Sequence, residues 1–299
     1  MRQVRYDRFG GIDQLWIDNL PRPVASPGQA VVRIHASCIN PGALSALHGA
    51  PYTPIRDLAG VVVSVGDGTP GVQAGDEVLG WSQEWSAHAE YVAVPVAQLI
   101  AKPVGLTWDV AGSLFVTPMA GLAGFDSVEP AAGEVVVVSG ATGGVGFTAA
   151  QLARRTGATV LGIGNPAKAE HLRAHGIIPV PFDGDIAEDV RTAADGRKID
   201  AFIDTVGSGY VRLALDLGVR PDRINTAVDY QTAKEHGVAT KGTMDAGGLP
   251  ALRTLADLAV AGDLDIPIAA TYPLAEVKAA YTTLAERRPF GRVVLHPQE

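Results

Sequence analysis

The sequence predicts a chain of two domains: a mainly β domain, followed by an α/β domain with a doubly wound parallel sheet. Residues 1 to about 115 carry short β-like runs that are broken by turn signals. From about Glu134 onward, strand and helix patterns alternate, starting with the run EVVVVSG. Its consecutive apolar residues are typical of a strand that is covered on both faces. The alternation therefore indicates a parallel sheet with crossover helices.

Hydrophobic periodicity and helix start and stop signals place the individual elements. In the first domain, the β-like runs lie at 30–35, 60–65, 76–79 and 89–94. In the second domain, we expect strands at 134–139, 159–163, 180–182, 201–204, 223–227 and 237–241, which makes five or six parallel strands. Helices are expected between them, at 144–155, 167–175 and 210–217.

The C-terminal part does not continue this alternation. A helix is expected at 250–261, followed by the strand-like run IPIAA, a helix at 274–287 and a strand at 292–295. These elements lack the next unit of a nucleotide-binding fold, so we expect the tail to return to the first domain. The predicted boundaries are 1–118 for the first domain, completed by 264–299, and 119–263 for the α/β domain.

Composition and charge exclude several classes of protein. The 299 residues are 47% hydrophobic and 19% charged, which is the profile of a well-buried globular chain. The net charge is −8 and the basic clusters are pairs such as Arg154-Arg155, so nothing predicts binding to nucleic acid or to an anionic membrane. The N-terminus lacks the apolar core of a signal peptide, and no apolar run reaches the roughly 18 residues of a membrane span. We expect a cytoplasmic protein.

A glycine-rich turn follows the first strand of the α/β domain. Gly140, Gly143 and Gly146 have the spacing G-x-x-G-x-x-G, directly after a buried strand and before an amphipathic helix. A dinucleotide diphosphate needs backbone N–H donors and a positive helix end brought close, and a Cβ would block that approach. We therefore predict a dinucleotide site with N–H donors from Gly143, Gly144 and Val145. The alternative is a glycine turn without a ligand.

The end of the next strand bears on which nucleotide binds. An acidic residue about 20 residues downstream of the turn would bond the ribose 2′-hydroxyl, but here the stretch reads GIGNPAK. Gly164 and Asn165 take the place of the acid, and Lys168 follows. A carboxylate would repel a 2′-phosphate whereas an ammonium attracts it, so the sequence favours NADPH over NADH. Lys168 as an ordinary surface lysine is the alternative, and Glu170 weakens the preference.

The order of these and further motifs resembles the medium-chain dehydrogenase/reductase superfamily. The motifs run from MRQVRYDRFGG through ASCINPG, DLAGVVVSVGDG with GDEV, AEYVAVP, AxxGGVG and DTVG to YPLAEVKAAY and FGRVVL, across essentially the whole chain. AxxGGVG is similar to the quinone oxidoreductase and enoyl reductase branch. The resemblance implies a GroES-like substrate domain, a Rossmann cofactor domain, a cleft between them, and a homodimer formed by edge-to-edge pairing of Rossmann sheets.

The metal ligands of the alcohol dehydrogenases in this superfamily are missing. The positions of the catalytic zinc's Cys and His fall on Asn40 and Arg56. The structural zinc lobe of those enzymes needs four cysteines, whereas this chain has only Cys38, which we expect to be a small buried residue. We predict no bound metal.

Two other patterns imitate known sites. His171 and His175 lie one helical turn apart, but Leu172 replaces the Glu that a zincin needs, so a surface helix face is expected. Tyr230 and Lys234 imitate the Tyr-x-x-x-Lys pair of short-chain dehydrogenases, although those enzymes begin with the glycine turn and place the pair much farther downstream of it. Tyr230 still follows the fifth strand, whose carboxyl edge faces the nicotinamide in such folds.

Without zinc, the sequence predicts reduction of an acceptor that is already activated by conjugation, a quinone or an α,β-unsaturated carbonyl. The resemblance implies that Asn40 hydrogen-bonds the acceptor oxygen; a turn-forming Asn before Pro41 is the alternative. Enoyl reductases of this branch carry a proton-donating Tyr, and Tyr52 stands one residue late for that position. Tyr52 beside Pro51 could instead close a turn.

The predicted function is that of a zinc-independent NADPH-dependent oxidoreductase that transfers hydride to a quinone or an enone. The alternatives are an enoyl or keto reductase of a biosynthetic pathway, and an NADPH-binding sensor without turnover, because Ala43 and Ala120-Gly121 replace polar family positions. The resemblance also places Arg292 near the cofactor, with a surface strand residue as the alternative. The predicted cofactor-binding residues are Gly140, Ala141, Thr142, Gly143, Gly144, Val145, Gly164, Asn165, Lys168, Thr205, Val206, Tyr230 and Arg292.

Overall fold

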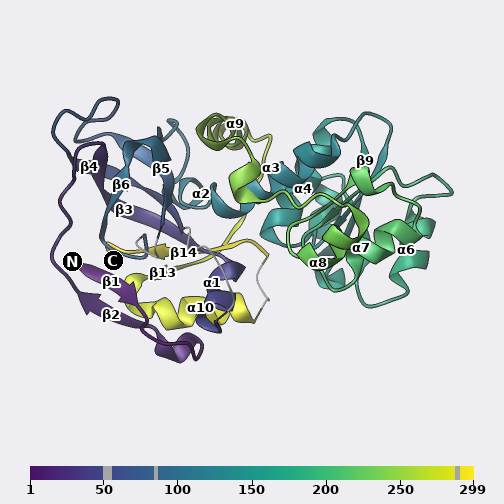
Figure 1. Cartoon of the computed structure of the whole chain (residues 1–299), viewed down its shortest axis with the longest axis horizontal. Helices are drawn as coiled ribbons and strands as arrows, with labels where there is room; N and C mark the ends of the chain where they lie inside the picture. Colours follow the sequence, from purple (N-terminus) through teal and green to yellow (C-terminus); the bar gives the residue numbers. More distant parts are fainter. Residues whose placement is uncertain (50–55, 84–86, 287–289) are drawn as a thin grey trace. The chain divides into compact units, whose positions relative to one another are not determined.

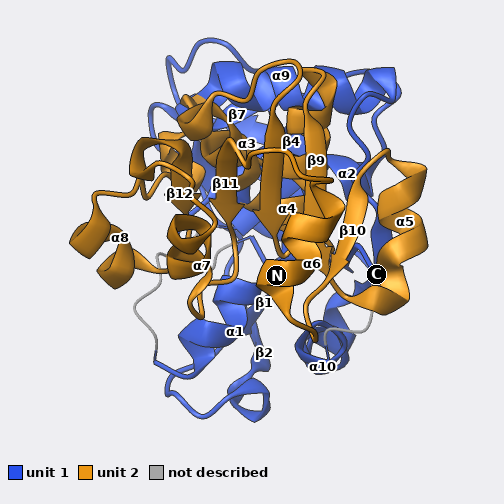
Figure 2. Ribbon diagram, turned by 90° about the vertical axis from the view of Figure 1, so that its right-hand side faces the viewer, with its two compact units in different colours: residues 1–116, 249–299 blue, residues 117–248 orange. Residues whose placement is uncertain are grey.

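The computed structural model describes residues 1–49, 56–83, 87–286 and 290–299, so Tyr52 lies outside the described residues. The chain forms two compact units (Figure 2): unit 1 is Met1–Val116 with Leu249–Glu299, and unit 2 is Thr117–Gly248. The tail thus returns to unit 1 at residue 249, earlier than the expected 264. Helix α9 (Gly248–Ala261) groups with unit 1, and its apolar periodicity is the same whichever unit covers it.

Unit 1 is built on one mixed sheet. Its strands run in the order β13-β14-β3-β4-β5-β7, and β6 also pairs with β3. A separate hairpin joins β1 (Arg2–Arg5) and β2 (Trp16–Asn19). The sheet strands are β3 (Gln29–Ile39), β4 (Arg56–Val65), β5 (Glu77–Ser82), β6 (Tyr91–Pro95), β7 (Leu99–Ala101), β13 (Ile268–Pro273) and β14 (Arg292–His296). This is the mainly β, GroES-like half that the sequence predicts.

Few helices accompany that sheet, and two begin with a side-chain cap. Asn40 caps α1 (Pro41–Leu47) and Thr107 caps α2 (Trp108–Ala111). Helix α10 (Val277–Ala285) packs against α1 and against β13 and β14. Both termini lie in this unit (Figure 1). There the Arg2 guanidinium donates to backbone oxygens of Pro297 and Glu299.

Unit 2 is a parallel sheet of five strands in the order β10-β9-β8-β11-β12. The first strand in the chain is thus central and the order reverses beside it, which is the arrangement of a Rossmann fold. The strands are β8 (Val135–Ser139), β9 (Thr159–Gly164), β10 (Ile178–Pro181), β11 (Ala201–Asp204) and β12 (Ile224–Thr226). The helices are α3 (Val116–Val128), which begins in unit 1, α4 (Gly144–Arg155), α5 (Ala169–Ala174), α6 (Ile186–Ala193), α7 (Tyr210–Asp216) and α8 (Tyr230–His236).

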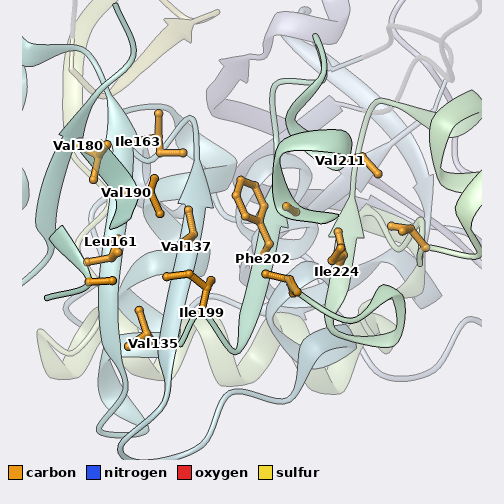
Figure 3. Packing of buried hydrophobic residues seen from close by; sticks show 14 of the residues in the cluster. Val135, Val137, Leu161, Ile163, Val180, Val190, Ile199, Phe202, Val211 and Ile224 are labelled. Carbon is orange, nitrogen blue, oxygen red and sulfur yellow. The ribbon is translucent and has the colours of Figure 1, made fainter. Parts of the chain in front are cut away.

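Alternate residues of the central strands form the core of unit 2. Val135 and Val137 of β8 and Phe202 of β11 point to one side of the sheet (Figure 3), while Val136 and Val138 are equally buried on the other. A strand covered on both faces must be apolar at every position, which explains the uninterrupted valine run. The packing of these strands in the core fixes the positions of their carboxyl ends, from which the loops of the candidate site start.

Two details of unit 2 differ from the sequence predictions. The prediction of a strand at 237–241 was wrong: that segment meets β12 at one isolated bridge, between Asn225 and Ala239. Beyond the bridge, the Asn225 side chain replaces a strand partner: it accepts the backbone N–H of Lys241 at 2.7 Å and donates to the Lys241 carbonyl at 3.2 Å. Helices α6 and α8 were not predicted, and both begin at an aspartate cap, Asp185 and Asp229.

Among the residues that the structure describes, no helix has the length and apolar character needed to cross a membrane.

Candidate functional site

The glycine turn lies between the central strand β8 and helix α4, as predicted. The N–H of Gly143 donates to the Gly140 carbonyl at 2.8 Å and closes the turn, so the prediction that this N–H is a donor to the diphosphate was wrong. The N–H of Phe147 donates to the Gly143 carbonyl at 2.8 Å and starts the helix. The residue that precedes the helix is Gly143, which has no side chain with which to cap it. The positive end of α4 therefore presents backbone alone, which suits an anion.

A Cβ would meet different neighbours at each glycine of the turn. Gly140 has a φ of +64°, and a Cβ there would stand 2.6 Å from Thr205 Oγ1. A Cβ on Gly146 would stand 2.4 Å from the Gly140 carbonyl oxygen, so helix and strand can approach only without one. Gly143 is exposed, and a Cβ there would meet only the Gly140 oxygen, at 3.3 Å. The outer side of Gly143 is thus where a ligand can approach the backbone.

The remaining residues of the turn connect it to β9. Ala141 is fully buried, and its N–H donates to the Ile163 carbonyl at 2.9 Å. The Thr142 hydroxyl accepts the N–H of Asn165 at 3.3 Å. A Cβ on Gly164 would stand 2.6 Å from the Thr142 methyl group. The predicted residues of the turn and of the end of β9 therefore lie together in the structure.

A pocket of about 400 Å³ opens at the carboxyl end of β9. It is lined by Gly164, Asn165, Pro166, Ala167, Ala169, Glu170, Leu172, Arg173, Pro179, Val180 and Pro181. Glu170 and Arg173 form an ion pair of 2.5 Å on its wall. Lys168 lies on the adjoining turn, outside this lining, and burial lowers its pKa. Sequence reasoning missed Arg173, although its i,i+3 spacing from Glu170 was a signal.

The carboxyl ends of β8, β11 and β12 are joined through Asp204, which is fully buried. Its carboxylate accepts the hydroxyl of Ser139 at 2.6 Å and that of Thr226 at 2.7 Å. It also accepts the N–H groups of Val206 and Gly207, each at 3.0 Å. Sequence reasoning noted the DTVG motif but gave its aspartate no role.

The carboxyl edge of β11 and β12 exposes apolar side chains. Val206 is 45% exposed, Val228 47% and Tyr230 63%. The Tyr230 hydroxyl donates to the Ala227 carbonyl at 3.0 Å, which holds its ring at the start of α8. Thr205 is held as well, since its hydroxyl donates to the Ser139 carbonyl at 2.8 Å. The structure thus places Thr205, Val206 and Tyr230 at the edge where the sequence expects them.

In unit 1, Asn40 is almost fully buried and caps helix α1. Its side-chain oxygen accepts the N–H of Ala43 at 3.3 Å. The turn-forming role weighed for this residue is therefore present. The amide oxygen cannot donate, so a hydrogen bond to the oxygen of a quinone or enone would come from the amide nitrogen.

Arg292 is buried and is not a surface strand residue, which corrects the alternative weighed for it. It belongs to β14, the neighbour of β3, and its charge acts on Asp57 and Cys38. Burial raises the pKa of Asp57 to about 6, against the opposing effects of two backbone N–H donors, from Val116 and Phe115, and of Arg292. Contact between Arg292 and a cofactor stays a prediction.

Cys38 is buried as expected, and burial raises the pKa of its thiol to about 12. Its backbone oxygen lies 3.4 Å from Nε2 of His88, whose Nδ1 lies 3.3 Å from the Tyr281 hydroxyl. Burial, together with the nearby charge of Arg56, lowers the pKa of His88 to about 3. This neutral histidine was not found from sequence, because its partners come from distant parts of the chain.

His171 of α5 and His175, which follows the helix, pack against unit 2's own side chains instead of forming a solvent-facing surface. The rings of His171 and His175 lie 5.0 Å apart, and His175 meets Phe147 edge to face at 4.9 Å. Both are half-buried, and Nδ1 of His175 lies 2.9 Å from the His171 carbonyl oxygen.

Comparison with known proteins identifies the family. A zinc-binding dehydrogenase family model matches residues 172–295, and an alcohol dehydrogenase GroES-like domain model matches residues 26–104. The chain is 29% identical to the quinone oxidoreductase of Rattus norvegicus, over 70% of this chain and 67% of that protein. It is also 29% identical to the 2-haloacrylate reductase of a Burkholderia species, over 92% of this chain and 93% of that protein.

The alignments with mammalian quinone oxidoreductases span between 52% and 67% of those relatives' own length. Among solved structures, the quinone oxidoreductase of Coxiella burnetii matches with a TM-score of 0.86, 23% identity and 99% of both chains, which shows the fold. By the resemblance, the positions of the catalytic zinc ligands fall on Asn40 and Arg56. The chain therefore belongs to the medium-chain dehydrogenase/reductase superfamily, in its zinc-independent branch of quinone oxidoreductases and enoyl reductases.

Proposed function

We propose that this protein is an NADPH-dependent oxidoreductase that transfers hydride to a quinone or to an α,β-unsaturated carbonyl compound. The observation that carries the proposal is the glycine turn, whose exposed Gly143 leads into an uncapped helix end after a buried strand. Two relatives are named for a quinone and for a haloacrylate, both of which are conjugated acceptors. A conjugated acceptor needs no metal to become electrophilic.

Bound NADPH would supply the hydride from its nicotinamide ring. Because the N–H of Gly143 already donates to the Gly140 carbonyl, the N–H groups of Gly144 and Val145 at the positive end of α4 would hold the diphosphate. Thr205 and Val206 would position the nicotinamide half. The Asn40 amide nitrogen would donate to the acceptor oxygen as negative charge develops there, and the helix cap keeps that amide in one orientation. Tyr52, which lies outside the described residues, stays the predicted proton donor.

The preference for NADPH rests on the end of β9. No carboxylate stands at Gly164 or Asn165 to accept the ribose 2′-hydroxyl, and the pocket there carries Arg173 on its wall, with Lys168 beside it. Glu170 opposes the preference, since it already pairs with Arg173. A 2′-phosphate carries more charge than that carboxylate and can accept bidentate bonds from the guanidinium. Arg173 therefore strengthens the inference first drawn from Lys168.

The test is to mix the purified protein with NADPH or NADH and a panel of quinones and enones, and to follow the reduced-nicotinamide absorbance. Faster oxidation of NADPH with at least one acceptor supports the proposal. Turnover of enones without quinones would favour the enoyl reductase, and turnover of ketones the keto reductase. Binding of NADPH without oxidation would instead favour the sensor. The homodimer and the cytoplasmic location stay predictions.

A further inference from the structure

Asp204 is a fully buried carboxylate for which the proposed reaction has no use. It ends β11, the strand next to the one that carries the glycine turn. Burying a charge is costly unless hydrogen bonds replace its water, and this carboxylate has a complete set of donors. Two hydroxyl groups and two backbone N–H groups donate to it directly, from Ser139, Thr226, Val206 and Gly207.

The hydrogen bonds around Asp204 all run from donors toward its carboxylate, either directly or through a hydroxyl group. The N–H of Thr205 donates to the Ser139 hydroxyl at 2.9 Å, and that hydroxyl donates to Asp204. On the other side, the N–H groups of Val228 and Asp229 donate to the Thr226 hydroxyl, at 3.2 and 3.0 Å. The Thr226 hydroxyl in turn donates to Asp204.

Five backbone N–H groups from two loops therefore point toward one carboxylate, directly or through a hydroxyl. They belong to Thr205, Val206, Gly207, Val228 and Asp229. The same loops, which follow β11 and β12, expose apolar side chains, Val206 and Val228 among them. The N-terminus of α4, proposed to bind the diphosphate, and these apolar loops thus lie at different places along the carboxyl ends of the same parallel strands.

We propose that Asp204 is the positioning residue for the nicotinamide half of the cofactor, an inference that rests on the proposed function. The carboxylate never touches the cofactor. It fixes the positions of the loops after β11 and β12 relative to the glycine turn. When the diphosphate of the cofactor binds at α4, the uncharged reduced nicotinamide ring then lies against Val206 and Val228. A small displacement of that edge would misplace the ring relative to its acceptor.

The carboxylate cannot be replaced by an amide of the same shape. In Asp204→Asn, whichever position the amide nitrogen takes, it faces groups that already donate. In the position of Oδ2 it meets the Thr226 hydroxyl and the N–H of Gly207, which stands 3.2 Å from that oxygen. The Thr226 hydroxyl already accepts two N–H groups, so it cannot accept a third donor and keep both. The substitution therefore loosens the loop after β12 while it changes no surface group.

The experiment compares Asp204→Asn with Asp200→Asn. Asp200 is the matched control, because its carboxylate also accepts a backbone N–H, that of Val135 at 3.0 Å, but stands at the opposite end of the same strands. Thr226→Val removes the relaying hydroxyl, and Thr226→Ser restores it. Each protein is assayed for kcat, for the affinity for NADPH, and for the affinity for adenosine 2′,5′-bisphosphate, a fragment without the nicotinamide half.

We expect Asp204→Asn and Thr226→Val to lower kcat by about tenfold or more, with fragment affinity changed less than about threefold, because only the ring is misplaced. Thr226→Ser and Asp200→Asn should keep kcat within about twofold of the wild type. An unchanged kcat in Asp204→Asn, or a parallel loss of fragment binding, would overturn the positioning role. Failure of the wild type itself to bind NADPH would instead overturn the proposed function, and this inference with it.

Discussion

Gly146 packs directly against the carbonyl group of Gly140: a Cβ at Gly146 would stand 2.4 Å from that oxygen. The first turn of α4 and the end of β8 are therefore in backbone contact. Gly143, three residues earlier, is exposed, and its nearest contact would be at 3.3 Å. Adding a methyl group would therefore have different consequences at Gly143 and at Gly146.

Alanine substitutions separate these roles. Gly146→Ala should destabilise the protein by about 1–3 kcal/mol, because backbone atoms must move to admit the methyl group. Gly143→Ala should destabilise the protein less than Gly146→Ala does, since its methyl group would stand 3.3 Å from the Gly140 oxygen, yet it should weaken NADPH binding by about tenfold or more, because the methyl group occupies the approach to the backbone. Urea unfolding and fluorescence titration with NADPH measure the two effects. Equal NADPH affinity in Gly143→Ala and the wild type would contradict the assigned site.

Arg173 should contribute to the choice between NADPH and NADH. Arg173→Gln should lower kcat/KM for NADPH by about tenfold and leave that for NADH within about twofold, because only a 2′-phosphate uses the guanidinium. Lys168→Gln should act in the same direction, and Glu170→Gln in the opposite one. The matched control is Arg191→Gln, since Arg191 forms an i,i+3 pair with Glu188 on α6. A parallel loss with both coenzymes would exclude a role in discrimination.

Asn40 combines a helix cap with the proposed catalytic amide. Asn40→Ser keeps a capping oxygen and loses the amide donor, whereas Asn40→Ala loses both. Turnover should fall by about tenfold or more in both variants, while only Asn40→Ala should lose about 1 kcal/mol of stability. Steady-state kinetics and urea unfolding distinguish the two effects. Full turnover in Asn40→Ser would show that the residue is only a cap.

His88 and Asp57 should give unit 1 opposing responses to acid. The pKa of His88 falls to about 3 on folding, so only the unfolded state takes up its proton as the pH drops below about 6.5, and stability is lost. The pKa of Asp57 rises to about 6, so the folded state takes up its proton first, and stability is gained as the pH falls below about 6.

From pH 7 to 5, the expected contributions are a loss of about 2 kcal/mol from His88 and a gain of about 1 kcal/mol from Asp57. Asp57→Asn should therefore be more acid-sensitive than the wild type, and His88→Asn less so. Urea unfolding at the two pH values measures these slopes independently of the constant effect of each substitution. Identical slopes in all three proteins would contradict the assigned pKa shifts.

Local patterns were sufficient to predict the strands and helices around the glycine turn. The short run of β-branched residues at Val135 favours a buried strand, and the stretch from Gly144 has the period of an amphipathic helix. The strand expected at 237–241 does not form, because Lys241 bonds the side chain of Asn225, a partner 16 residues away that the local pattern does not reveal. The return to unit 1 was placed late for a similar reason, since the pattern of α9 does not encode its partner.

The candidate site likewise contains residues that are close in the sequence, which could be predicted, and partners that are distant in the sequence, which could not. The turn from Gly140 to Gly146 is local, so its spacing predicted its place. Asp204 gathers Ser139 and Thr226 from strands 65 and 22 residues away in the chain, and Asp57 meets Phe115 across 58 residues. Such partners become visible only when the sheets are formed, because nothing in the sequence near Asp204 or Asp57 indicates a buried carboxylate.

The most direct test of the central claim is NADPH oxidation by protein that has been dialysed against a strong zinc chelator, with a quinone and an enone as acceptors. Saturable oxidation that the chelator does not lower, and that Gly143→Ala weakens through NADPH affinity, is the predicted result. Loss of activity that added zinc restores, or failure of NADPH to bind at all, would contradict the account.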